Sequence, residues 1–146
     1  AYDKYPNQEM ADKLGVKLVS QDEVLSLADI ISIHLPATDE TKHLISKANI
    51  DKMKDGVYVV NTARGSIVYE KDMAEALKSG KVAGFASDVF ETEPIDLAGP
   101  LFDFPNYIAT PHVSAETYEN CETTSVVTAK AILAVFGGKE PEHKLV

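Results

Sequence analysis

The chain has 146 residues, of which 45% are hydrophobic and 25% charged, a composition that excludes an intrinsically disordered chain and predicts one globular domain with its own core. Its 14 basic and 23 acidic residues give a formal net charge of −9, which argues against nucleic acid or an anionic membrane as the main partner. With Cys121 as its single cysteine and no apolar run near the roughly 20 residues of a membrane helix, we expect a cytoplasmic protein without a membrane segment.

Short apolar runs typical of buried strands alternate with amphipathic stretches typical of helices along the whole chain. One helix begins with a capping box, because Ser20 is followed three residues later by Glu23. Pro36 and two glycine-containing pairs, Asp55-Gly56 and Ser79-Gly80, mark where elements end. The predicted strands are 17–19, 29–35, 57–60, 82–89 and 107–110, and the predicted helices are 21–28, 41–53, 70–78 and 115–136. This alternation predicts an α/β fold, a doubly wound parallel sheet covered on both faces.

Three polar motifs follow the last three predicted strands, and each contributes a different functional group. Arg64 provides a cation, the segment 88–94 provides carboxylates and His112 provides an imidazole. Ligands bind at the carboxyl ends of the strands in open α/β sheets, so we expect these groups to meet at one edge of the sheet. Such a combination is typical of an active site. The motifs are Asn61-Thr62-Ala63-Arg64-Gly65, Asp88-Val89-Phe90-Glu91-Thr92-Glu93-Pro94 and Thr110-Pro111-His112.

Together with the stretch from Ala28 to Pro36, followed by Thr38 and Thr41, these motifs resemble the nucleotide-binding domain of the D-isomer-specific 2-hydroxyacid dehydrogenases. The resemblance runs to about residue 138, so we expect a partial dinucleotide-binding domain over residues 1–138 and a C-terminal tail over 139–146. It implies an oxidoreductase that transfers a hydride between NAD and a D-2-hydroxy acid or 2-oxo acid, with no metal. Glyoxylate, pyruvate, hydroxypyruvate and phosphoglycerate all stay open as substrates.

The resemblance implies three catalytic residues. His112 is the candidate acid and base, because an unperturbed imidazole has a pKa of about 6.5. Arg64 is the candidate clamp for the substrate carboxylate, which a guanidinium can bind through two hydrogen bonds. Glu93 is the candidate partner that orients His112. Glu91 competes with it, but the family pattern places the functional carboxylate directly before Pro94, which leaves Glu91 as a solvated residue.

The resemblance also implies which residues bind the cofactor. Asp3 takes the place of the acidic residue that binds the ribose hydroxyls, and this favours NAD over NADP because a carboxylate repels a 2′-phosphate. The full implied set is Asp3, Pro36, Thr62, Ala63, Arg64, Asp88 and His112.

No G-x-G-x-x-G motif occurs in the sequence, although the resemblance places this phosphate loop about 20 residues before Asp3. We therefore expect an incomplete Rossmann-like sheet that lacks the first βα unit with the Gly-rich loop, and no substrate domain. The edge of the strand at 29–35 would then be open, and we expect a second copy, as in a homo-oligomer such as a dimer, or a complement from the missing N-terminal part to cover it. The isolated fragment is expected to be inactive and to bind NAD weakly.

Two other functions stay open. The first is an NAD(H)-sensing, corepressor-like binding module of the same superfamily, in which the same three residues occur. The second is an inactive structural fragment.

Overall fold

The computed structural model describes residues 1–144 and divides the chain into two compact units, one from Ala1 to His112 and one that begins at Val113. The tail predicted at 139–146 falls partly outside the described residues, because Leu145 and Val146 are not among them.

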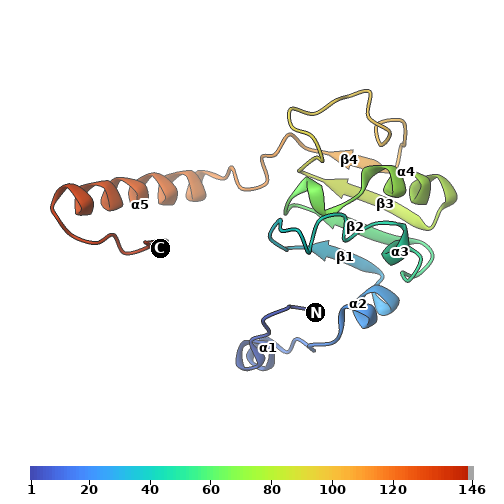
Figure 1. The fold of residues 1–146 in the computed structure, drawn as a ribbon, viewed down its shortest axis with the longest axis horizontal. Helices are drawn as coiled ribbons and strands as arrows, with labels where there is room; N and C mark the ends of the chain where they lie inside the picture. Colours follow the sequence, from blue (N-terminus) through green and yellow to red (C-terminus); the bar gives the residue numbers. More distant parts are fainter. Residues whose placement is uncertain (145–146) are drawn as a thin grey trace. The chain divides into compact units, whose positions relative to one another are not determined.

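The first unit is built on a four-stranded sheet in the order β1-β2-β3-β4 (Figure 1). All neighbouring strands are parallel, which confirms the predicted parallel α/β fold. Strands that are consecutive in the chain are neighbours in the sheet. Because all four strands are parallel, their carboxyl ends lie at the same edge. The strands are β1 (Ile30–Ile33), β2 (Val57–Asn61), β3 (Val82–Ser87) and β4 (Tyr107–Ala109).

α2, α3 and α4 contribute buried residues to the core on one face of this sheet. α4 contacts β3, and α3 contacts α4. Ser20 caps α2 through the predicted capping box, and Gly80 ends α4 with a φ of 76°. A further helix, α1, was not predicted. It begins after Asn7, whose side chain accepts a hydrogen bond from the Met10 amide. The helices are α1 (Gln8–Leu14), α2 (Gln21–Leu27), α3 (Lys47–Ile50), the 3₁₀ turn η1 (Gly65–Ile67) and α4 (Glu70–Ser79).

Two predicted elements are wrong. Residues 41–53 do not form one long helix, because the backbone around Ile45 pairs with Ile67 and Tyr69 instead. Only the short α3 follows this pairing. Residues 17–19 do not form a strand of the sheet, because their backbone bonds only with Ala1, at 2.6 and 2.9 Å.

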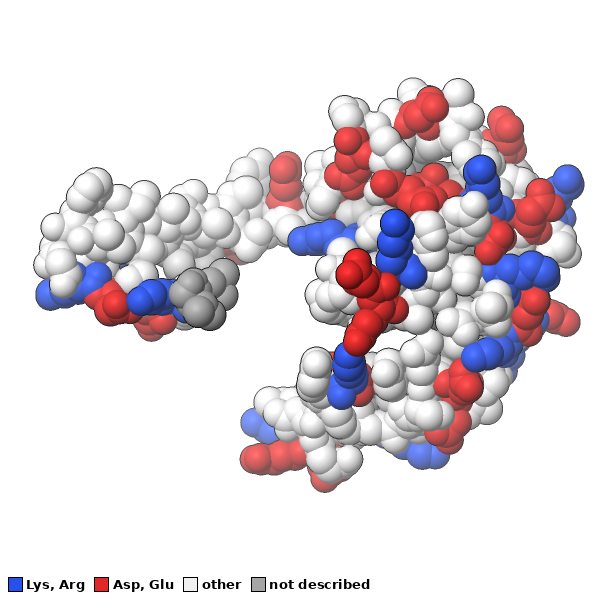
Figure 2. Space-filling model, viewed as in Figure 1, with Lys and Arg blue, Asp and Glu red and all other residues white. Residues whose placement is uncertain are grey.

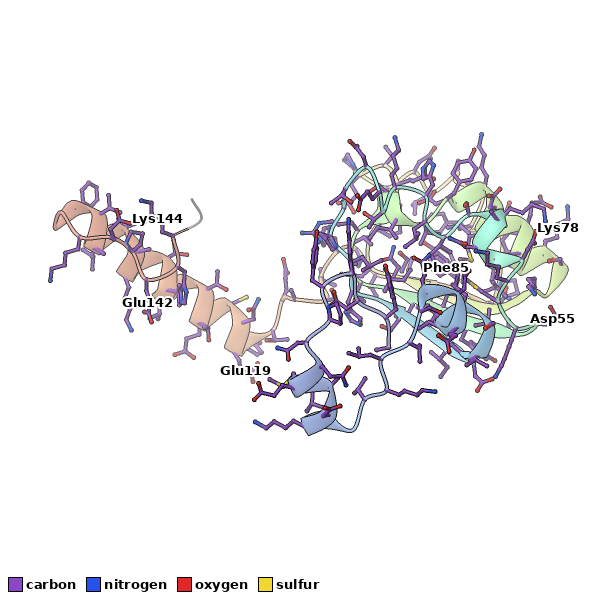
Figure 3. All side chains as sticks on the ribbon, turned by 60° about the horizontal axis from the view of Figure 1, so that its bottom comes forward. Asp55, Lys78, Phe85, Glu119, Glu142 and Lys144 are labelled. Atoms are coloured by element: carbon purple, nitrogen blue, oxygen red, sulfur yellow. The ribbon has the colours of Figure 1, made fainter. Side chains whose placement is uncertain are left out.

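The core lies between the sheet and the helices. Ile31, Val59 and Phe85 point into it, and they pack with residues from α2, α3 and α4. Phe85 lies inside the first unit, whereas Asp55 and Lys78 lie at its edge (Figure 3). The opposite face of the sheet was expected to be covered as well. Within residues 1–112 it is not, because Ile30, Tyr58 and Ile108 on that face are 67%, 54% and 65% exposed.

β1 is an edge strand that pairs only with β2. A cavity of about 680 Å³ runs along β1. It is lined by residues 1–3 and by residues of α2 and β1. The lining is mainly apolar and includes Val24, Leu27 and Ile31. This agrees with the prediction of an open edge at the strand that precedes Pro36.

The second unit consists of α5 (Tyr118–Phe136) and the residues around it. The helix begins after Thr117, whose hydroxyl accepts a hydrogen bond from the Asn120 amide, and it ends at Gly137. Among the described residues no helix is long and apolar enough to cross a membrane. On the face drawn in Figure 2, acidic and basic side chains are interspersed over the first unit, and no extended basic region appears there.

Candidate active site

The three polar motifs converge at the carboxyl edge of the sheet. Arg64 follows β2, Glu93 follows β3 and His112 follows β4. All three side chains line one shallow cavity of about 350 Å³, together with residues of the turn after Arg64 and the loop before Glu93. The structure therefore brings together the three residues for which the sequence suggests catalytic roles.

His112 and Glu93 form a direct contact. Nδ1 of His112 lies 3.0 Å from Oε2 of Glu93, and their side chains are 49% and 41% exposed. His112 has a φ of 58°, which is uncommon for a residue other than glycine. Its amide donates a 2.9 Å hydrogen bond to the Thr110 carbonyl. This tight turn aims the imidazole at Glu93 and leaves Nε2 as the ring nitrogen that Glu93 does not engage.

The contact shifts the titration of Glu93. The hydrogen bond with His112 lowers the pKa of Glu93 below its ordinary value of 4.5, and the Phe90 amide and the charges of His112 and Arg64 act in the same direction. Because the pKa of Glu93 is lower in the folded than in the unfolded state, its carboxylate stabilises the fold at pH values above its ordinary pKa. That contribution is lost as the pH falls through the folded-state value. The exposure of Glu93 keeps the contribution small.

Replacement of His112 by alanine is expected to raise the pKa of Glu93 toward its ordinary value, because the largest of the interactions that lower it is removed. Titration of the Glu93 carboxyl carbon by ¹³C NMR measures this change. The Phe90 amide still donates to Glu93 in the variant, so part of the lowering should persist. His34→Ala is the control, since His34 bonds with Ser32 instead. An unchanged midpoint in His112→Ala would show that the contact is absent in solution.

Asn61 builds the turn that presents Arg64. This side chain is fully buried at the end of β2. Its Nδ2 donates to the Arg64 carbonyl and its Oδ1 accepts from the Ala63 amide, both at 3.0 Å. No separate role was predicted for Asn61, although a polar residue at the end of a buried apolar strand indicates one, because buried polar groups are hydrogen-bonded.

The prediction that Glu91 is a solvated residue is wrong. Its side chain is only 25% exposed, and its Oε1 lies 2.7 Å from Nε2 of His43. Its Oε2 accepts a 3.1 Å hydrogen bond from the Glu70 amide. The expectation was wrong because it considered the motif alone, whereas both partners come from distant parts of the chain.

Most residues with implied cofactor roles lie at the carboxyl edge of the sheet, and Asp3 lies in the cavity along β1. Thr62 is exposed and Ala63 half-buried beside Arg64, while Asp88 is only 3% exposed and accepts a 2.5 Å hydrogen bond from the Thr110 hydroxyl. Pro36 is exposed at the carboxyl end of β1. Asp3 lies apart from the other candidates and lines the cavity along β1.

The chain is similar to proteins described as dehydrogenases and reductases of hydroxy acids and oxo acids. Residues 1–114 match the family described as D-isomer specific 2-hydroxyacid dehydrogenase, NAD binding domain. The chain is 45% identical over 138 residues to a D-3-phosphoglycerate dehydrogenase of Archaeoglobus fulgidus, which covers 94% of this chain and 26% of that protein. It is 40% identical over 136 residues to a glyoxylate reductase of Thermofilum pendens, covering 93% of this chain and 38% of that protein.

A crystal structure of a D-lactate dehydrogenase from Treponema pallidum superposes with a TM-score of 0.88 at 37% sequence identity. This match covers 99% of the chain and 47% of that protein. The chain therefore spans between about a quarter and a half of the length of these three relatives.

Proposed function

The chain belongs to the D-isomer specific 2-hydroxyacid dehydrogenase family, and we propose that it forms the cofactor side of the active site of an oxidoreductase that transfers a hydride between NAD and a D-2-hydroxy acid or 2-oxo acid. The observation that carries this proposal is the 3.0 Å contact of His112 with Glu93 in the cavity that Arg64 also lines. The acidic composition and the single cysteine support a cytoplasmic location.

Each of the three residues has a separate task in this reaction. The guanidinium of Arg64 binds the substrate carboxylate and fixes the orientation of the reacting carbon. Nε2 of His112 accepts the hydroxyl proton when the alcohol is oxidised and returns it when the ketone is reduced. Glu93 holds Nδ1 of the imidazole and stabilises its protonated form.

We propose that two separate groups of residues of this chain contact the two ends of NAD, which would supply the hydride acceptor and donor when it is bound. Thr62, Ala63 and Asp88 lie beside the three catalytic candidates and suit the nicotinamide end, with Pro36 at the next strand end. Asp3 lines the cavity along β1 and suits the ribose hydroxyls. The sequence contains no G-x-G-x-x-G motif for the pyrophosphate.

The proposal is tested by a chimera in which this chain replaces the aligned 138 residues of the Archaeoglobus fulgidus D-3-phosphoglycerate dehydrogenase. We expect the chimera to oxidise D-3-phosphoglycerate with NAD, measured by the absorbance of NADH. A folded chimera that binds NAD and has no dehydrogenase activity would contradict the proposal.

By itself, the chain is expected to bind NAD weakly and to show no dehydrogenase activity. The reason is that a Gly-rich loop at a helix N-terminus is the usual binding site of the pyrophosphate, and the sequence has no such loop. Calorimetric titration with NAD measures the affinity. Binding in the micromolar range would contradict this prediction.

We also propose that the open edge of β1 takes up a further strand, either from a second copy of the chain or from a complementary segment of the parent protein. The unpaired backbone of the edge strand β1 favours such pairing. Sizing chromatography coupled to light scattering is expected to show a dimer or larger species. A stable monomer across a wide concentration range would exclude pairing between copies.

A further inference from the structure

Glu91 lies two residues before the candidate catalytic carboxylate and makes three polar contacts with two residues, His43 and Glu70. Its carboxylate contacts Nε2 of His43 at 2.7 Å and accepts from the Glu70 amide at 3.1 Å. Its amide donates to Oε1 of Glu70 at 2.9 Å. Glu91 and Glu70 thus exchange hydrogen bonds reciprocally, and the Glu91 carboxylate satisfies a free amide at the start of α4, where the cap residue Tyr69 makes no side-chain bond.

His43, which contacts the Glu91 carboxylate, is fixed by contacts of its own backbone and ring. His43 has a φ of 52°, and its amide donates a 2.8 Å hydrogen bond to the Ser66 carbonyl. Its ring packs on that of Tyr69, with 4.6 Å between the ring centroids. An imidazole fixed at both backbone and ring offers Glu91 a partner in one orientation only.

The loop that Glu91 fixes is the one that carries Glu93. The Phe90 amide donates to Oε1 of Glu93 at 3.1 Å, and Oε2 of the same carboxylate faces His112. The Phe90 carbonyl lies against Gly65, next to Arg64. A shift of residues 90–91 would therefore move the Glu93 carboxylate and the surroundings of Arg64 together.

We propose that Glu91 is a positioning residue, which ties the loop 90–93 to α4 and His43 and so holds the Glu93 carboxylate on His112. The catalytic meaning of this inference rests on the proposed function, but the coupling between Glu91 and Glu93 does not. Glu91 and Glu93 then have different tasks although they are two residues apart. One fixes the loop and the other contacts the imidazole.

The test is a ¹³C NMR titration of the Glu93 carboxyl carbon in the whole chain, with Glu91→Ala and Glu91→Gln compared with the unchanged protein. In Glu91→Ala we expect the Glu93 pKa to rise and the Phe90 amide to exchange with deuterium about fivefold faster, as the loss of one hydrogen bond implies. Glu91→Gln should restore most of the original behaviour, because its amide can accept from Glu70 and donate to His43. Glu75→Gln, at an exposed position of α4, should change nothing.

Leu77→Ala separates positioning from stability. It removes a buried side chain of α4, so it destabilises the first unit without touching the loop 90–93. An equal change of the Glu93 titration in Leu77→Ala, or an unchanged titration in folded Glu91→Ala, would overturn the inference. If Glu91→Ala does not fold, Glu91→Asp is decisive in the same way, because its shorter side chain cannot reach both partners. The measurement needs no cofactor or substrate, so it is independent of any failure of the proposed function.

Discussion

Replacement of Gly65 by alanine is expected to destabilise the first unit by about 3 kcal/mol and to separate Arg64 from Glu93. A Cβ at this position would lie 1.8 Å from the Phe90 carbonyl oxygen and 2.6 Å from the Glu91 nitrogen. Both are backbone atoms, so no flexible side chain can move aside. The loop 90–93 must shift as a whole, and Glu91 and the other hydrogen bonds of that loop resist the shift.

Urea unfolding followed by near-ultraviolet circular dichroism of the tyrosines measures the loss of stability. Gly56→Ala is the matched control. Gly56 has a φ of 78° with open space around its Cα, so an added methyl group meets no atom and costs only the strain of the left-handed backbone, about 1–2 kcal/mol. Equal losses in the two variants would contradict the close approach of the two loops. In Gly65→Ala the ¹³C titration of Glu93 should also change, whereas in Gly56→Ala it should not.

The parallel sheet was predictable because its signals are local. Each strand is a short apolar run, and glycine or proline ends several elements within a few residues. The helix predicted over residues 41–53 failed for the opposite reason. Ile45 bonds with Ile67 and Tyr69, and pairing over such a distance leaves no local pattern. α1 was missed because only Ala11 on this mostly polar helix is buried, so the helix has no apolar stripe to detect.

Some features of the candidate site could likewise be predicted from local sequence signals, whereas others depend on contacts between distant residues. The positions of Arg64, Glu93 and His112 at strand ends follow from the order of strands, since parallel strands end at one edge of the sheet. The environment of Glu91 does not follow from it, because its partner His43 lies 48 residues earlier in the chain. Sequence spacing therefore indicates which groups meet in the site. The hydrogen bonds that fix their loops become visible only in three dimensions.

His112→Gln in the chimera with the Archaeoglobus fulgidus enzyme is expected to lower kcat by about 10²–10⁴-fold, the range typical for loss of a general acid or base. Glutamine keeps a polar group of similar length beside Glu93 but cannot accept and release a proton near neutral pH. The KM for D-3-phosphoglycerate should change little, because Arg64 still binds the carboxylate. His143→Gln, at an exposed position of the second unit, is the control. A kcat that stays within a few-fold of the unchanged chimera would remove His112 from the mechanism, and would leave its contact with Glu93 as a structural feature of the turn after β4.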